Sequence, residues 1–295
     1  MALSEPYHRV SMNTEFIEAN GIRFRVEVDG DGPLILLLHG FPHFSYQWRH
    51  ILPSLAARGY RAVAPDLRGI GQTSRPTRIE DYRLPILGED VAALITALGE
   101  RKAHVIGHDW GGLIAWETAF AHPEVVDRLI TVNGPPAHIP PRRWGARLRQ
   151  LARSWYAFYF ALPWSPERFL TRGHSGIMPR LLDGGRFSLE ETAVYRDAIC
   201  QPDAAWAALA YYRAWVRNIF ANARRLRGKV VTAPTLVIWG ERDRSLGVEL
   251  THDMDRYVRG PLRIVRLPEE GHWLVQNQPD RFAEMVMDFL EEEFG

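Results

Sequence analysis

VIGHDWGG, residues 105–112, follows a short apolar run and precedes a helix-like segment. Glycines stand two positions before and two positions after Asp109, at Gly107 and Gly111, and Gly112 follows. A nucleophile on a sharp strand-to-helix turn needs small residues at these positions, because larger side chains would collide. The pattern therefore predicts a nucleophile elbow whose apex is Asp109, where a serine hydrolase would carry Ser. A simple helix cap at Asp109 is the alternative, but a cap does not require glycines on both sides.

Short apolar runs, each followed by a turn, surround this elbow and predict strands: LILLLHGFP, YRAVAPDLRGIG, AHVIGHDWGG, RLITVNGPP, APTLVIWGERD and PLRIVRLPEEGH. Helix-like segments lie among them: SYQWRHILPSLAARG, PILGEDVAALITALGE, WGGLIAWETAFAHP and PDRFAEMVMDFLEEEF. Continuous apolar strands that alternate with helices are typical of a parallel sheet covered on both faces. The sequence predicts an α/β fold with a doubly wound, mostly parallel sheet.

The strand rhythm is interrupted between about Pro135 and Lys229, where Arg, Trp and Tyr are frequent and the patterns are helical. We therefore expect residues 1–134 to form the first part of the core, residues 135–229 a helical cap insertion, and residues 230–295 the second part of the core. The basic stretch PPRRWGARLRQLARSWY is best explained as a solvated cap helix rather than a partner-binding helix.

Composition excludes several function classes. The 295 residues carry 36 Lys plus Arg and 35 Asp plus Glu, so the net charge of +1 does not recruit nucleic acid. Cys200 is the single cysteine, which predicts a reducing, cytoplasmic location, and the polar N-terminus lacks the apolar core of a secretory signal. The longest apolar run, Trp155–Trp164, is too short to span a membrane and predicts a buried or pocket-lining segment. We expect neither nucleic acid nor membrane as a partner.

The elbow predicts an acid and a histidine later in the chain, each on a loop after a strand. Asp243 follows TLVIWG and His272 follows LRIVRLPEEG, in the required order. Two other residues compete for the role of the acid. Asp66 precedes the elbow and is better suited to fixing its own loop, and the loop after RLITV offers Asn133 rather than an acid.

The backbone N–H groups of Trp110 and Phe41 are the expected oxyanion hole, with His39 and Gly40 shaping the second loop. Unlike Ser, Asp109 is an anion at neutral pH without help from a base. A carboxylate that attacks an sp³ carbon forms an ester, which His272 and Asp243 would then hydrolyse through an activated water. The motif thus indicates epoxide opening or carbon–halogen cleavage.

HGFP, APDLRGIGQTS, GHDWGG, GERD and EGHW stand in the order found in the α/β-hydrolase superfamily, and within it the chain resembles the soluble epoxide hydrolases. That resemblance implies conversion of a small-molecule epoxide and water to a vicinal diol, without cofactor or metal. It also implies two cap tyrosines that donate to the epoxide oxygen. SWYAFYFALPW places Tyr156 at the first position and LAYYRAW places Tyr212 at the second, with Tyr159, Tyr195 and Tyr211 as neighbouring alternatives.

Haloalkane dehalogenases share the Asp elbow and the following Trp, so Trp110 does not discriminate between the two activities. Phe41 occupies the position where many of them carry a halide-binding Asn, although a cap Trp could replace that Asn: Trp155, Trp164, Trp206 or Trp215. Trp110 and Leu113 stand where fluoroacetate dehalogenases carry Arg, which argues against haloacid substrates. A non-catalytic binding protein of the same fold would be expected to lack part of the Asp–His–Asp set. The oligomeric state is not predicted.

Overall fold

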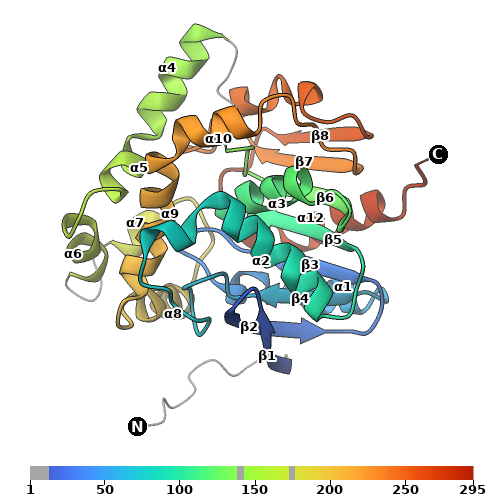
Figure 1. Cartoon of the computed structure of the whole chain (residues 1–295), viewed down its shortest axis with the longest axis horizontal. Coiled ribbons are helices and arrows are strands. Elements are labelled where there is room, and N and C mark those ends of the chain that lie inside the picture. Colours follow the sequence, from blue (N-terminus) through green and yellow to red (C-terminus); the bar gives the residue numbers. More distant parts are fainter. Residues whose placement is uncertain (1–12, 138–142, 173–176, 295) are drawn as a thin grey trace.

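The computed structural model describes residues 13–137, 143–172 and 177–294. Its centre is an eight-stranded sheet in the order β1-β2-β4-β3-β5-β6-β7-β8 (Figure 1). β2 runs antiparallel to β1 and β4, and the other neighbouring strands are parallel. The strands are β1 (Asn13–Ala19), β2 (Ile22–Asp29), β3 (Leu34–Leu38), β4 (Arg61–Pro65), β5 (Ala103–His108), β6 (Val126–Val132), β7 (Thr235–Gly240) and β8 (Leu262–Leu267). The predicted mostly parallel, doubly wound sheet is confirmed.

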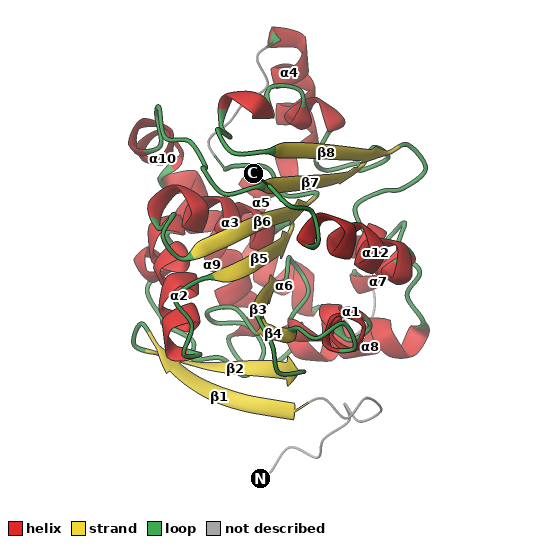
Figure 2. Ribbon diagram, turned by 90° about the vertical axis from the view of Figure 1, so that its right-hand side faces the viewer, coloured by secondary structure: helices red, strands yellow, loops and turns green. Residues whose placement is uncertain are grey.

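Helices cover both faces of the sheet, as Figure 2 shows. One face packs against α1 (Ile51–Ala56) and α12 (Pro279–Leu290), and the other packs against α2 (Leu84–Ala97) and α3 (Trp110–Ala121). Side chains of neighbouring strand residues point to opposite faces, so Val105 joins the core under α2 and α3 while Ile106 joins the core under α1 and α12. Both are fully buried, which explains why the strand sequences are continuously apolar.

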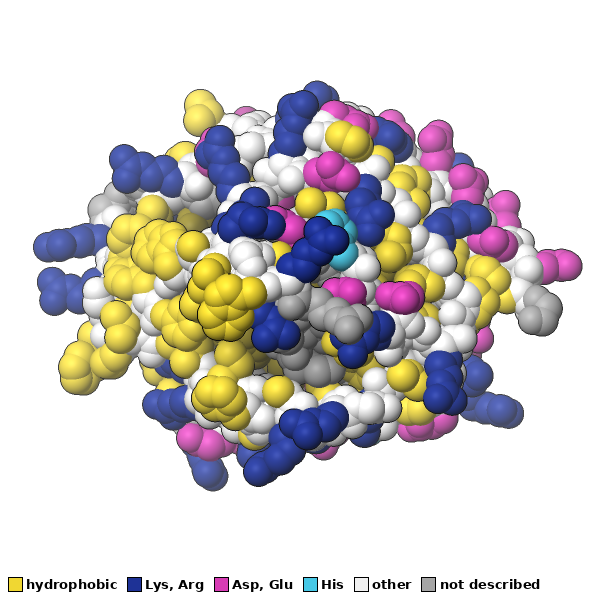
Figure 3. All heavy atoms as spheres, turned by 90° about the horizontal axis from the view of Figure 1, so that it is seen from above, with side chains coloured by type: hydrophobic (Ala, Val, Ile, Leu, Met, Phe, Trp, Pro, Cys, Tyr) yellow, Lys and Arg dark blue, Asp and Glu magenta, His cyan; other side chains and the backbone are white. Residues whose placement is uncertain are grey.

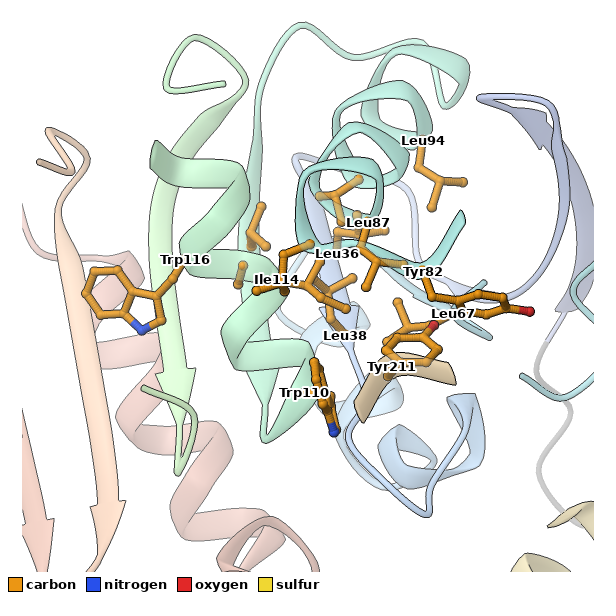
Figure 4. Close-up of a cluster of buried hydrophobic side chains, with 14 of the residues drawn as sticks. Leu36, Leu38, Leu67, Tyr82, Leu87, Leu94, Trp110, Ile114, Trp116 and Tyr211 are labelled. Carbon is orange, nitrogen blue, oxygen red and sulfur yellow. The ribbon is translucent and has the colours of Figure 1, made fainter. Parts of the chain in front are cut away.

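A cluster of large side chains links the sheet, the elbow helix and the cap (Figure 4). It combines leucines from β3 and α2 with aromatic residues from α3 and α9 (Ala204–Arg217): Leu36, Leu38, Leu87, Leu94, Trp110, Ile114 and Tyr211. The Trp110 ring lies edge-on to Tyr211, with ring centroids 5.5 Å apart. The start of α3 is therefore packed directly beneath the cap.

The segment between β6 and β7 is helical in its described residues, and no strand was found in that part of residues 135–229. The helices are α4 (Trp144–Arg153), α5 (Trp155–Phe160), α6 (Ser165–Thr171), α7 (Met178–Leu181), α8 (Leu189–Ile199), α9 and α10 (Ile219–Arg225). α11 (Leu274–Asn277) belongs to the second part of the core. The division of the chain into a cap of residues 135–229 between two parts of the core remains a prediction. No helix within the described ranges combines the length and apolar character that a membrane crossing requires.

One expectation is confirmed in part and another needs correction. The run Trp155–Trp164 contributes Tyr156, Ala157 and Phe158 to the lining of a cavity, as expected of a pocket-lining segment, but its end residues are not buried, since Trp155 is 66% exposed and Trp164 is 79% exposed. The helix expected over residues 45–59 is a 3₁₀ turn, Ser45–Trp48, followed by the short α1. The N-terminal residues on which the expectation of a missing secretory signal depends lie mostly outside the described residues.

The antiparallel β1–β2 hairpin was not predicted. Asn20 and Gly21 form its two-residue turn, and both have positive φ angles, 47° and 71°. An Asn-Gly pair between strands favours this turn, because both residues tolerate the left-handed backbone. The signal was present in the sequence, but the strand residues of β1 are mostly exposed and polar, so no apolar run marks them.

Candidate active site

Asp109 occupies a strained turn between β5 and α3, with φ 52° and ψ −119°. The flanking glycines permit it. A β-carbon on Gly107 would lie 2.2 Å from the Gly111 carbonyl oxygen, and one on Gly111 would lie 2.0 Å from the Leu38 carbonyl oxygen. No side chain fits at either position, so the predicted elbow geometry is explained by contacts of its own backbone and of β3.

The two carboxylate oxygens of Asp109 have different surroundings. Oδ1 accepts a 2.9 Å hydrogen bond from the Phe41 N–H, and the Trp110 N–H also hydrogen-bonds the carboxylate. Oδ2 lies 3.9 Å from Nε2 of His272. Burial raises the pKa of Asp109, and His272 and the two N–H groups oppose that rise. Oδ1 is thus held by the Phe41 N–H group, while Oδ2 faces the histidine.

His272 and Asp243 form a buried ion pair in the order that the elbow predicts. Nδ1 of His272 donates to Oδ2 of Asp243 at 2.7 Å. Burial opposes protonation of His272, but the Asp243 and Asp109 carboxylates together outweigh it and raise the pKa of His272. Burial likewise opposes ionisation of Asp243, yet His272 and the N–H groups of Ser245 and Leu246 lower its pKa. The arrangement holds Asp243 ionised and orients Nε2 of His272 toward Asp109.

From the sequence, Asn133 was considered only as a residue that cannot replace the catalytic acid, and its hydrogen bonds to Asp243 and Gly240 were not predicted. Its amide nitrogen donates to Oδ2 of Asp243 at 2.8 Å, and its amide oxygen accepts from the Gly240 N–H at 2.9 Å. Asn133 is fully buried at the end of β6 with φ 39°, a conformation that Asn tolerates better than most residues. Together with the strand-end location, that tolerance is a signal that could have indicated a positive-φ turn at Asn133, although not its contact with Asp243.

Two other histidines support the site without facing Asp109. His39 donates from Nδ1 to the Gly40 carbonyl at 2.9 Å and accepts from the Leu67 N–H through Nε2 at 3.0 Å. Burial lowers the pKa of His39 to about 4, so the ring is neutral and its tautomer is fixed by these bonds. Nε2 of His108 donates to the His272 carbonyl at 2.9 Å, and burial lowers the pKa of His108 to about 3.

Asp66 holds its own loop, as the sequence indicates. Its carboxylate accepts hydrogen bonds from the Ser45 N–H at 2.9 Å and the Gln72 N–H at 3.1 Å. A β-carbon on Gly71 would lie 2.0 Å from Oδ2 of Asp66, so this loop closes tightly around the carboxylate. Asp66 therefore has its acceptors occupied away from His272.

Tyr156 of α5 and Tyr212 of α9 both line the cavity that contains Asp109. Their ring centroids lie 6.3 Å apart. Burial raises the pKa of both hydroxyls, and the nearby Asp109 carboxylate raises each further, so both stay protonated donors. The structure thus brings the two predicted cap tyrosines and the predicted nucleophile to one cavity.

The neighbouring tyrosines are engaged elsewhere. The Tyr211 hydroxyl donates to the Arg68 carbonyl at 2.7 Å, and Tyr159 pairs with Ser165 near the surface. Tyr195 packs in an aromatic cluster with His43 and Phe44. These three tyrosines are absent from the residues that line the Asp109 cavity.

The cavity has a volume of about 360 Å³ and a mainly apolar lining. Among the four cap tryptophans considered as halide donors, Trp215 lines it, but its indole N–H donates to the Ala137 carbonyl at 3.3 Å. Trp155 and Trp164 face solvent, and Trp206 stacks edge-on against Tyr82. In the described residues, no group of three or more His, Cys, Asp or Glu side chains could hold a metal ion.

A doubly wound sheet, an elbow nucleophile and an Asp–His pair on the following loops define an α/β-hydrolase. Residues 33–170 match the family model of the alpha/beta hydrolase fold. The chain is 36% identical to human Epoxide hydrolase 4, over 94% of this chain and 78% of that protein, and 38% identical to Epoxide hydrolase 3 of Xenopus tropicalis, over 93% and 76%. The crystal structure of Epoxide Hydrolase A from Mycobacterium thermoresistibile superposes with a TM-score of 0.86 at 28% identity, covering 97% of this chain and all of that one. The chain belongs to the epoxide hydrolase family of the α/β-hydrolases.

Proposed function

We propose that the protein hydrolyses an epoxide to a vicinal diol through an ester on Asp109, with water as the only co-substrate. One observation carries the proposal: the Phe41 N–H donates to Oδ1 of Asp109 and the Trp110 N–H hydrogen-bonds the same carboxylate, while Tyr156 and Tyr212 line the same cavity. This combination places a nucleophile and two hydroxyl donors around one small volume. The names of the family relatives support the same reaction.

In the first step, Oδ2 of Asp109 attacks one epoxide carbon and the bond between that carbon and the epoxide oxygen breaks. The departing oxygen would be a strongly basic alkoxide, so it needs a proton or strong hydrogen bonds as it leaves. Tyr156 and Tyr212 donate these hydrogen bonds, and one of them supplies the proton. Oδ1 remains on the Phe41 N–H group and becomes the carbonyl oxygen of the ester.

In the second step, Nε2 of His272 takes a proton from water, and the resulting hydroxide attacks Cγ of Asp109. Negative charge develops on Oδ1, where the N–H groups of Phe41 and Trp110 stabilise it. Asp243 stabilises the imidazolium that forms on His272. The ester bond then breaks and His272 returns its proton to the departing diol oxygen. The second proton of the water, left on the Asp109 carboxyl group, restores the tyrosine that gave up its proton in the first step, so that both side chains are ready for another turnover. One oxygen of water stays on Asp109.

Asp109, His272 and Asp243 could also cleave a carbon–halogen bond, but the residues that the cap contributes to the cavity argue against dehalogenase activity. A halide leaves as a stable anion and needs N–H donors rather than proton donors. The only cap tryptophan of the four candidates that reaches the cavity, Trp215, has its N–H directed to a backbone carbonyl. The two hydroxyls of Tyr156 and Tyr212 instead suit an oxygen leaving group.

The test compares the two leaving groups directly. Purified protein is incubated separately with a terminal aryl epoxide and a primary alkyl bromide, and diol and bromide release are quantified. We expect diol from the epoxide and no bromide release, and we expect Asp109→Ala to abolish the diol. Diol formation that persists in Asp109→Ala would refute the scheme, and bromide release alone would identify a dehalogenase.

A further inference from the structure

The cap exposes a continuous row of large apolar side chains. The row runs along α4, α5 and the bend that follows α5, at alternating spacings of four and three residues, and is called the apolar stripe: Trp144, Leu148, Leu151, Trp155, Phe158 and Leu162. Trp144 is 70% exposed, and all six residues are among the exposed large hydrophobic residues of the chain. The sequence pattern favours a cap helix exposed to solvent. Exposure of the apolar face of such a helix to water is unfavourable, however, and a large exposed apolar patch is typical of an interaction site.

The polar side of α4 forms hydrogen bonds and ion pairs with the core. These contacts leave the opposite side of the helix, which carries the apolar stripe, exposed to solvent. Gln150 donates to the Ser245 carbonyl at 2.8 Å and accepts from the Gly247 N–H at 2.9 Å. Arg149 and Arg153 form ion pairs with Glu249 at 3.0 and 3.1 Å. These contacts hold α4 against the loop that follows Asp243 and turn the stripe away from the core.

Positive charge surrounds the stripe. Residues 143–166 contain four Arg and no acidic residue, and residues 204–229 contain five Arg and one Lys, again without an acidic residue. Five of these arginines form ion pairs with acids from other segments: Arg149, Arg153, Arg213, Arg217 and Arg225. Arg143, beside Trp144, is exposed, and so is Arg224 of α10. Figure 3 shows the apolar surface on the left of the molecule with basic side chains around it. The chain as a whole has a net charge of only +1, so the basic character is concentrated on the cap.

The mouth of the cavity lies in the same surface. Leu151 and Phe158 belong to the apolar stripe and also line the cavity that contains Asp109. Phe220 of α10, which is 88% exposed, lines it as well. An apolar molecule that reached this surface would therefore meet side chains that also line the cavity, whose lining is mainly apolar but includes Arg147, Gln150 and Ser154.

We propose that the apolar stripe and the arginines around it dock the cap onto an anionic lipid surface, with the cavity mouth facing the bilayer. Trp, Leu and Phe side chains enter the boundary between headgroups and acyl chains, while Arg contacts the lipid phosphates. This is surface docking and does not require a membrane-spanning helix. The proposal departs from the expectation that no membrane is a partner.

Charge decides between a lipid surface and a second copy of the chain. Two copies that paired through the stripe would bring the exposed Arg143 and Arg224 of each copy toward the same boundary. Like charges at such positions oppose association. An anionic bilayer supplies the opposite charge over the whole surface, and Trp is enriched where proteins meet the membrane–water boundary.

Vesicle flotation of the full chain tests the proposal without any measurement of turnover, so its result is independent of the proposed reaction. Vesicles of phosphatidylcholine alone are compared with vesicles of phosphatidylcholine and phosphatidylglycerol, at low and high salt. We expect flotation with the anionic vesicles and less of it at high salt. Trp144→Gln combined with Leu148→Gln should weaken partitioning at least about tenfold, and Arg143→Gln combined with Arg224→Gln about fivefold for each charge removed.

Leu189→Gln is the matched control, because Leu189 is 90% exposed but lies on α8 rather than on the stripe. It should float like the unmodified protein, and thermal unfolding should show that every variant is folded. Flotation that is absent, or that responds equally to the Leu189 and stripe substitutions, would overturn the proposal. Concentration-dependent dimerisation that the Trp144/Leu148 variant abolishes, without flotation, would assign the stripe to a homodimer interface and would also overturn it.

Discussion

Replacing Tyr212 by Phe should slow formation of the ester on Asp109 by about 100-fold, which corresponds to about 2.7 kcal/mol of lost transition-state stabilisation. The magnitude follows from the site: Tyr212 is 5% exposed, and the departing oxygen would have two hydroxyl donors in a cavity lined mainly by apolar groups. Removal of the Tyr212 hydroxyl takes away one of the two hydrogen bonds that stabilise the negative charge on the departing epoxide oxygen. In a mainly apolar cavity, water does not replace that hydrogen bond. The ring and its packing against Phe41 and Trp110 are retained.

The assay is a rapid-quench single turnover with protein in excess over a terminal aryl epoxide, in which the ester is quantified by mass spectrometry. Tyr211→Phe is the matched control on the same helix. It removes the 2.7 Å hydrogen bond to the Arg68 carbonyl, so it should cost about 1–2 kcal/mol of unfolding free energy while the rate of ester formation stays unchanged. An unchanged rate in Tyr212→Phe, or an equal loss in Tyr211→Phe, would refute the assignment of the donor.

Three further outcomes follow from the contacts of the site. Gly111→Ala should lower the thermal midpoint steeply and cost more than about 3 kcal/mol, because its β-carbon would lie 2.0 Å from the Leu38 carbonyl oxygen; a midpoint like that of the unmodified protein contradicts the elbow geometry. Asn133→Gly should cost about 2–4 kcal/mol of unfolding free energy through its lost hydrogen bonds to Asp243 and Gly240, measured by urea unfolding, and an unchanged midpoint would show that these bonds contribute nothing. Ester hydrolysis needs neutral His272, so its rate, followed in stopped-flow single turnovers, should fall as pH decreases through a pKa raised above 6.5; a rate that is flat down to pH values well below 6.5 would exclude His272 as the base.

The sequence predicted the sheet and the elbow well because both depend on local constraints. Continuous apolar runs locate strands that are buried on both faces, and the glycines around Asp109 are required by backbone contacts within a few residues. Asp243 and His272 could be placed because parallel strands bring their C-terminal loops to one edge of the sheet. Their 2.7 Å contact is a consequence of that topology.

The remaining features depend on packing between distant segments. Nothing in the local sequence says that Asn133 reaches Asp243, because the contact is set by the relative position of β6 and β7. The apolar stripe has the periodicity of a buried helix face, and only the anchorage of Gln150 to the loop after Asp243 turns that face to the solvent. Periodicity indicates that a helix has an apolar face but not which neighbour covers it.

Intact-mass spectrometry of purified His272→Gln protein exposed to a terminal aryl epoxide tests the central claim most directly. Without the base, Asp109 can still attack the epoxide but the ester cannot be hydrolysed, so the ester should accumulate. The account predicts a mass increase equal to the whole epoxide, located on the peptide that contains Asp109 and absent when Asp109 is also replaced by Ala. An adduct on another residue, or diol formation in His272→Gln at the rate of the unmodified protein, would contradict it.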